Sequence, residues 1–218
     1  MIRMLQRWAG GVSRPAARAL ALVLAAILPL VGGCTLSNMP GFGDRTPAKP
    51  EYSGLAHHSV AIVVLADDST LYEYPDIPLN VSQAVASALT VAVPGVKVTD
   101  PRALTKFERD NPYWETLPPS DLIRRLKVQR LMLIDLTHFS THEPGNANVW
   151  MGVMVANVSI GEAESANPDN FVYRTNVSAQ YPGDRSLGVL DSDEQTVRLA
   201  LLQTFTHNLL ARFVASSR

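Results

Sequence analysis

The chain of 218 residues carries 19 basic and 20 acidic side chains, a single cysteine, and 46% hydrophobic residues. This near balance of charge, without a basic cluster, excludes the electrostatic footprint of a nucleic-acid-binding protein. A lone cysteine excludes an internal disulfide and a cysteine-based zinc site.

The first 33 residues have the plan of a secretory signal. Four arginines are the only charges before Cys34, and the apolar run "ALALVLAAILPLV" follows them over residues 19–31. That run is short for a transmembrane helix, which needs ~20 apolar residues. A basic segment, an apolar segment and small residues in this order indicate a signal peptide that is removed from the mature protein.

Cys34 stands directly after Val31, Gly32 and Gly33. This stretch resembles the lipobox of bacterial lipoproteins, and the resemblance implies cleavage between Gly33 and Cys34, acylation of the Cys34 thiol, for example with palmitate, and acylation of the new amino terminus. The alternatives are an ordinary secretory signal with an incidental cysteine, or an uncleaved anchor. Two or more acyl chains would anchor the protein stably, because one chain binds a membrane only marginally.

Residues 34–58 are rich in Pro, Gly and Ser and have no periodic pattern, which predicts a flexible tether with His57 and His58 exposed to solvent. Thr35 and Leu36 lack the Asp that favours retention in the inner membrane, so we expect the outer membrane, with the protein facing the periplasm. Without the signal peptide, 185 residues with 15 basic and 20 acidic side chains remain. That size suits one domain, over residues 59–218.

The first half of this domain alternates strands and helices. Residues 59–66 ("SVAIVVLA") read as a strand buried on both faces. A helix is expected over residues 79–93, with Asn80 as its N-cap, before Pro94-Gly95. Residues 96–101 read as a short strand, and residues 115–128 as a short helix that prolines open.

The second half is mainly sheet. Strands are expected over residues 130–140, 149–160 and 171–181, with a Pro144-Gly145 turn after the first of them. The last helix, 193–216, follows a capping-box spacing of Ser192 and Gln195. Its core stripe recurs every four residues: Val197, Leu201, Phe205, Leu209 and Phe213.

The order β-α-β-α-β-β-β-α predicts a single α+β domain, a mixed sheet packed by helices. Strand 149–160 is apolar on both faces, so a second cover is expected beside the helices, and a second copy of the chain could supply it. A homo-oligomer is therefore a further expectation.

The lipobox, this order, and the pairing of "SVAIVVLA" with "RLMLIDLTHFS" resemble the periplasmic lipoprotein superfamily that includes CsgG, the amino-terminal domain of TolB, LpoB and PelC. Residues 111–160, with their Asn-Pro-x-Trp stretch and Glu-Pro-Gly turn, are similar to an uncharacterised lipoprotein family of planctomycete-type bacteria. The resemblance implies a role in an envelope assembly. Relatives introduce the strand at 130 with a Gly-Ala-Asp-Tyr-like turn, where this chain has Lys127–Arg130, so a different turn is expected.

Candidate catalytic residues are few. His138 and His142 lie at a strand end and in the following loop, where four residues span ~13 Å, too far apart for one zinc ion. His207 is expected at the boundary of the last helix. Asp67 and Asp68 follow the first strand, where open α/β sheets place ligands, although paired Asp residues also simply start loops. No hydrolase, phosphate-loop or metalloprotease motif is present in the sequence.

Tyr113 and Trp114 stand in a proline-flanked polar segment and are candidate partner contacts, because binding hot spots favour these residue types; Trp114 could equally plug one end of the core. Two functions remain open. The first is a lipid-anchored, non-catalytic interaction domain that binds an envelope protein and needs no cofactor. The second is a ligand-binding or hydrolytic lipoprotein that uses Asp67 and Asp68.

Overall fold

The computed structural model describes residues 49–183 and 188–215. Its elements in chain order are β1 (Ser59–Ala66), α2 (Asp68–Glu73), α3 (Ile77–Ala92), β2 (Lys97–Val98), α4 (Pro101–Asp110), the 3-10 helix η3 (Trp114–Thr116), α5 (Pro119–Leu126), β3 (Arg130–Glu143), β4 (Asn146–Glu162), β5 (Tyr173–Tyr181) and α6 (Glu194–Leu210). None of these helices combines the length and apolar character that a bilayer crossing requires.

One mixed sheet forms the centre of the domain, in the order β2-β1-β3-β4-β5. β1 pairs parallel with β2 and β3, whereas β3–β4 and β4–β5 are antiparallel. The predicted class, a single α+β domain with a mixed sheet packed by helices, is confirmed.

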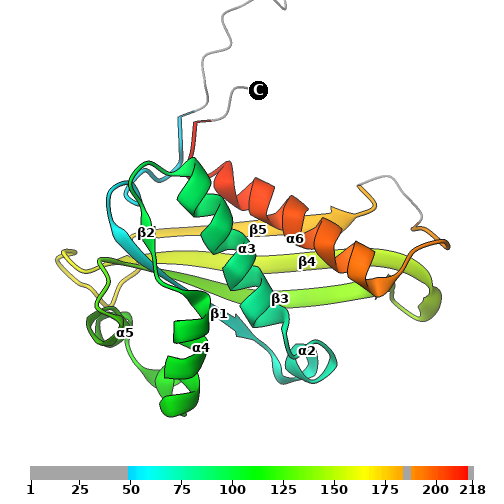
Figure 1. Cartoon of the computed structure of the whole chain (residues 1–218), viewed down its shortest axis with the longest axis horizontal. Coiled ribbons are helices and arrows are strands. Elements are labelled where there is room, and N and C mark those ends of the chain that lie inside the picture. The colour runs from blue at the N-terminus through cyan, green and yellow to red at the C-terminus, as the bar shows by residue number, and fades with distance from the viewer. Residues whose placement is uncertain (1–48, 184–187, 216–218) are drawn as a thin grey trace, which may run out of the picture. The chain divides into compact units, whose positions relative to one another are not determined.

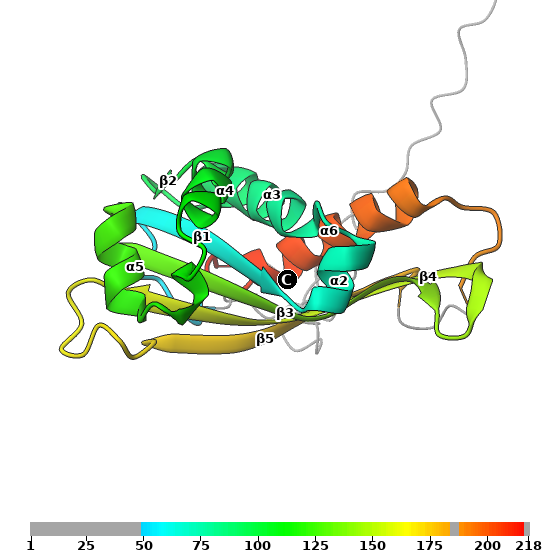
Figure 2. The same cartoon turned by 90° about the horizontal axis from the view of Figure 1, so that it is seen from below.

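Helices α3 and α6 lie side by side on one face of this sheet (Figure 1). They bury the larger apolar cluster, to which β1, β3, β4 and β5 contribute alternate residues. On the other face, Trp114 of η3 and Leu122 and Ile123 of α5 form a smaller apolar cluster with Ala61, Val63 and Leu131. Ile123 also lies near Gly161 of β4, and Figure 2 shows α5 at this end of the sheet. Asp169, from the loop between β4 and β5, accepts a 3.2 Å hydrogen bond from the Ser120 N–H in the first turn of α5.

The predicted stripe of the last helix is confirmed as core. Its five members, Val197, Leu201, Phe205, Leu209 and Phe213, are at most 5% exposed. Helix α6 approaches β4 closely at Gly152, where an added Cβ would lie 2.7 Å from side-chain carbons of Val197 and Leu201. A larger residue at position 152 would force these side chains to shift.

In the part of one copy of the chain that the structure describes, helices cover only one face of the middle of strand β4. Met154 and Ala156 are fully buried toward α6, but Val153 and Val155, which point the opposite way, are only half-buried. Among the described residues, no helix lies over that part of the sheet (Figure 2).

Several element ends differ from the prediction. α3 begins at Ile77 rather than at Asn80, because Asp76 precedes it and Pro78 fits its first turn. The side chain of Asp193, not that of Ser192, caps α6 through the Thr196 N–H, and the helix ends at Leu210 rather than at 216.

Two helices were not expected at all. α2 has only six residues, and α4 follows Asp100, whose side chain accepts a hydrogen bond from the Arg102 N–H. The β3–β4 hairpin is longer than expected and closes at the predicted Pro144-Gly145 turn, where Gly145 has a φ of +80°.

Candidate functional site

The segment that leads into β1 is held against the rest of the domain. We call residues 51–58 the strap. The sequence predicts a flexible tether up to residue 58, and for the strap this prediction is wrong. Leu55 is 1% exposed and belongs to the larger apolar cluster. The backbone N–H groups of Glu51 and Tyr52 both donate to the Arg212 carbonyl, at 2.8 and 3.2 Å. Buried apolar contacts and backbone pairing therefore order a segment whose composition alone predicted a coil.

Arg130, the first residue of β3, fastens the middle of the strap. Its side chain is 4% exposed and donates from Nε to the Gly54 carbonyl at 2.9 Å. Its two terminal nitrogens bind both carboxylate oxygens of Glu164, at 2.7 and 2.5 Å. Such two-pronged pairs combine charge with fixed geometry. Arg130 thus joins the strap, β3 and the segment after β4 in one contact.

His58 belongs to the same cluster instead of facing solvent as expected. Its Nε2 lies 3.1 Å from Nη2 of Arg130, and its Nδ1 lies 2.7 Å from the Ala56 carbonyl oxygen. A guanidinium can only donate, so Nε2 is the acceptor, and Nδ1 carries the proton that is donated to Ala56. His57 remains exposed, with a φ of +62°.

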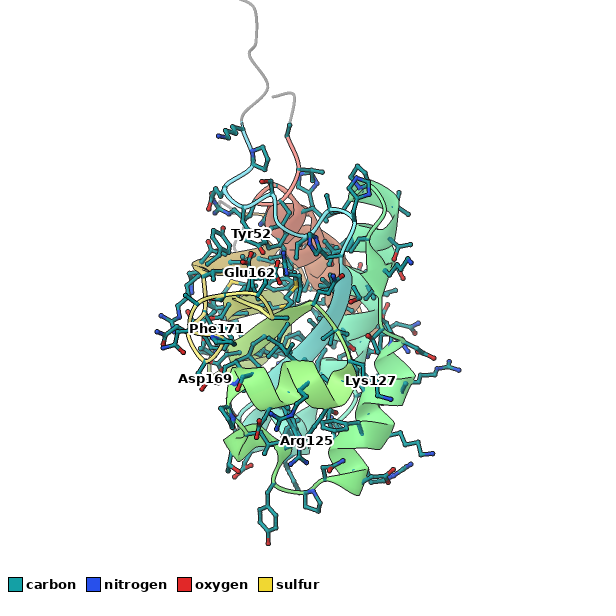
Figure 3. All side chains as sticks on the ribbon, turned by 90° about the vertical axis from the view of Figure 1, so that its left-hand side faces the viewer. Tyr52, Arg125, Lys127, Glu162, Asp169 and Phe171 are labelled. Atoms are coloured by element: carbon teal, nitrogen blue, oxygen red, sulfur yellow. The ribbon has the colours of Figure 1, made fainter. Side chains whose placement is uncertain are left out.

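The start of the strap meets β5 and the end of α6. Tyr52 stacks on Tyr173 with ring centroids 5.4 Å apart and meets Phe213 edge-on. The Tyr52 hydroxyl donates to Glu162 at 2.6 Å, and Figure 3 shows these two side chains lying together. Glu51 pairs with Arg212 and accepts a 2.7 Å hydrogen bond from the Tyr173 hydroxyl.

Hydrogen bonds in this cluster keep the carboxyl groups of Glu164 and Glu51 ionised. The hydrogen bond from Arg130 lowers the pKa of the Glu164 carboxyl. Hydrogen bonds from Tyr173 and Arg212 lower the pKa of Glu51. Burial, followed by the hydrogen bond to Glu162, raises the pKa of the Tyr52 hydroxyl, so this group is a neutral donor. These hydrogen bonds hold the strap to β5, the end of α6 and the segment after β4.

The two carboxylates proposed for chemistry have structural surroundings. Asp67 is the N-cap of α2 and accepts from the Thr70 N–H at 2.8 Å. Hydrogen bonds from the Ser69 hydroxyl and from the Thr70 backbone lower the pKa of Asp67 to about 2. A carboxylate with so low a pKa is a poor general base near neutral pH. Asp68 lies in the first turn of α2 and is exposed.

The remaining histidines are not gathered together. His138 is exposed on β3, whereas the ring of His142 packs on Trp150 with centroids 4.1 Å apart. His207 is exposed near the end of α6. Within residues 49–183 and 188–215, no group of three or more His, Cys, Asp or Glu side chains is placed to hold a metal ion.

The two candidate partner contacts have opposite environments. Trp114 is 9% exposed and packs in the smaller apolar cluster with Leu104 and Leu122, as a plug would. Tyr113 is 80% exposed, so of the two only Tyr113 is accessible to a partner. The predicted cleavage site Gly33 and lipidation site Cys34 lie outside the described residues.

A groove of about 940 Å³ runs between α3 and α6. Its α3 wall consists of polar and small residues, and its α6 wall includes Leu199, Leu202 and Leu210. Leu199 lies well inside the length of α6, away from both ends, and its side chain is 51% exposed. Leu202, by contrast, is only 7% exposed and also belongs to the larger apolar cluster.

The sequence reading missed Arg130 and its partners as a functional cluster. In the sequence, Arg130 stands out only as the last residue of Lys127–Arg130, the stretch that differs from the turn expected from the family resemblance. In the structure that turn places Lys127 in the left-handed region, at a φ of 54°, as the C-cap of α5. An arginine opening an apolar strand was the available signal, but its partners lie 34 and 76 positions away.

No protein-family model and no curated protein matches the chain. Among solved structures, it is similar to the PelC dodecamer from Paraburkholderia phytofirmans, with 12% identity and a TM-score of 0.45 over 78% of this chain and 94% of that chain. It is also similar to the lipoprotein GNA1162 from Neisseria meningitidis, with 12% identity and a TM-score of 0.45 over 70% and 97%. The LpoB C-terminal domain from Salmonella enterica matches at 6% identity and a TM-score of 0.28 over 57% and 83%. At these values the similarity assigns neither a family nor a function to this chain.

Proposed function

We propose that this protein is a lipid-anchored, non-catalytic interaction domain of the bacterial envelope, held in the outer membrane by acyl chains on Cys34 and facing the periplasm. It binds another envelope protein, as components of secretion, transport or wall-synthesis assemblies do. The observation that carries the proposal is the strap, because the residues that follow the anchor are built into the fold by the buried Arg130.

The strap sets how far the domain can lie from the membrane. Sixteen residues separate Cys34 from Glu51. At no more than ~3.6 Å per residue, the 17 steps along the chain keep Glu51, the first residue of the strap, within about 61 Å of the anchored cysteine. Because the domain is attached at this one end, the rest of its surface is free to meet partner proteins within that distance of the anchor.

The use of the ionisable residues supports binding over catalysis. Asp67 caps a helix, Glu164 and Arg130 hold the strap, and Trp114 is core. Each of these side chains has a structural partner that accounts for it. Exposed apolar side chains such as Tyr113 and Leu199 suit a protein interface better than a reaction centre.

Crosslinking in intact membranes, followed by purification of the acylated full chain, tests the proposal. We expect a defined envelope protein to co-purify with the wild-type chain. It should not co-purify with an unrelated outer-membrane lipoprotein that is crosslinked and purified in the same way as the control. The purified chain is also assayed for hydrolysis of envelope polymers, in the wild type and in the Asp67→Asn and Asp68→Asn variants. A hydrolytic activity lost in either variant would show that the protein belongs to the other class.

A further inference from the structure

A cavity of about 170 Å³, smaller than the α3–α6 groove, lies between α3 and α4 beside β1. We call it the slot. Strand β2 pairs with β1 only at Ser59 and Val60, so among the described residues no strand accompanies the rest of β1 on that side. Helix α4 contacts β1 and α3 there instead. Ile62 and Val64, which line the slot, lie just beyond the last paired residue of β1.

Two helical stripes line the slot on opposite sides. Their residues are Pro75, Pro78, Leu79 and Ser82 from α3 and the turn before it, and Pro101, Leu104, Thr105 and Glu108 from α4. Both sets follow the spacing i, i+3, i+4, i+7, which places side chains on one side of a helix. Ile62, Val64 and Leu104 are buried and form the floor, whereas Thr105 is exposed at the mouth.

The side chains that line the slot provide hydrogen-bond acceptors. The Ser82 hydroxyl donates to the Leu79 carbonyl at 2.9 Å, and the Thr105 hydroxyl donates to the Pro101 carbonyl at 3.2 Å. Each hydroxyl hydrogen is therefore already used, and only oxygen lone pairs remain. An ionised Glu108 can likewise only accept. A ligand that pairs with these side chains must donate.

Glu108 is the charged residue among those that line the slot. Its side chain is half-buried, and within residues 49–183 and 188–215 its carboxylate takes part in none of the ion pairs. Burial, followed by the charge of Glu115, raises the pKa of Glu108. A carboxylate that is partly removed from water ordinarily has a cationic partner. An unpaired one in a cavity indicates where a positively charged group binds.

From these observations we propose that the slot binds a short primary alkylammonium group. The ammonium pairs with the carboxylate of Glu108 and donates to the oxygen of Thr105, and its methylene chain packs on Leu79 and on the proline rings. At roughly 30 Å³ for each water-sized group, the slot has room for about five or six non-hydrogen atoms. A metal ion is a poorer occupant, because it needs several oxygen ligands and gains nothing from apolar walls.

The same alkylammonium group ends a small soluble amine and the lysine side chain of a partner protein. Binding at the slot does not depend on the proposed function, because a soluble amine would occupy the slot whether or not the domain also binds an envelope protein. Failure of one proposal therefore leaves the other standing.

Titration of n-butylammonium chloride into the acylated full chain, with ¹³C-labelled methyl groups in detergent micelles, tests the site. The methyl signals of Leu79 and Val64 should shift, with a dissociation constant on the order of millimolar for so small a ligand. The signals of Leu199, in the other groove, should not shift. Butyrate has a chain of the same length and the opposite charge, so equal shifts with butyrate would overturn the inference.

A matched pair of variants tests the role of the carboxylate. Glu108→Gln keeps the size of the side chain and should weaken n-butylammonium binding at least about tenfold. Asp110→Asn removes a charge at an exposed position of the same helix and should leave binding unchanged. Thr105→Tyr, which retains Glu108 and fills the mouth of the slot, should abolish binding. Wild-type affinity in Glu108→Gln or in Thr105→Tyr would overturn the inference.

A photo-crosslinker at position 105 of the full chain in intact membranes distinguishes the two sources of the amine. An adduct with a partner segment that carries a lysine or a free amino terminus assigns the slot to a protein side chain. Binding of n-butylammonium without any protein adduct assigns it to a soluble amine. An adduct with a segment that has neither a lysine nor a free amino terminus would overturn the inference.

Discussion

Replacing Arg130 by methionine should release the strap. Methionine keeps most of the apolar volume but removes the guanidinium, which binds Gly54, Gln129, Glu164 and His58. The carbonyl of Gly54 loses its partner in a half-buried position. Glu164 is 56% exposed, so its carboxylate is solvated once the arginine is gone, and only part of the cost of breaking a buried pair applies.

We therefore expect Arg130→Met to lower the free energy of unfolding by about 2–3 kcal/mol, within the range for hydrogen bonds to charged groups. Arg124→Met is the matched control, because Arg124 is 73% exposed and pairs only with Asp121. That change should cost less than about 0.5 kcal/mol.

Denaturant unfolding of the full chain measures the loss, and amide hydrogen exchange over residues 51–58 locates it. Exchange in the strap should accelerate in Arg130→Met while the amides of β3 and β4 remain protected. A loss below about 0.5 kcal/mol, or unchanged exchange in the strap, would show that burial of Leu55 alone holds the segment.

Three further changes probe other parts of the molecule. Phe205→Ala should lower the free energy of unfolding by about 3–5 kcal/mol, because Phe205 is fully buried between α6 and the sheet, and a melting temperature within a degree or two of the wild type would contradict this. In the folded protein the pKa of Asp67 is about 2, below its ordinary value, so Asp67 contributes stability above about pH 4 that is lost as the pH falls toward 2. When stability is measured against pH, Asp67→Asn should therefore lose less stability than the wild type between pH 4 and pH 2, and an equal loss in both would refute the capping role. Lys127→Gly should raise the free energy of unfolding by about 0.5 kcal/mol in a denaturant titration, since glycine relieves the left-handed backbone at the end of α5, and a loss of stability would mean that the lysine side chain makes an essential contact.

The sequence predicted elements whose signal is periodic and local. The stripe from Val197 to Phe213 repeats every four residues, and the run of residues 59–66 is continuously apolar, so both were placed correctly. Helix α4 was missed because Leu104 is its only buried residue, although Asp100-Pro101 is a good start signal. Helix α2 is too short for periodicity to mark it.

The candidate site depended on contacts that no local pattern encodes. Tyr52 and Glu162 are 110 positions apart, and Arg130 and Gly54 are 76 apart. The Pro, Gly and Ser content of residues 34–58 indicated a coil, yet Tyr52 and Leu55 pack on the core and Arg130 binds Gly54, so the final part of this segment is docked. The groove was likewise hidden, since the pattern of one helix cannot show that Leu199 of α6 faces a groove beside α3.

Metabolic labelling with a fatty-acid analogue tests most directly that this domain works as a lipid-anchored protein. Label should be incorporated into the wild-type chain, whose mature form should begin at Cys34, and should be absent from Cys34→Ser, which should accumulate as an unprocessed or mislocalised precursor. The same amount of label in both chains, or a mature wild-type protein in the membrane without acyl groups, would contradict the anchor on which the proposed function depends.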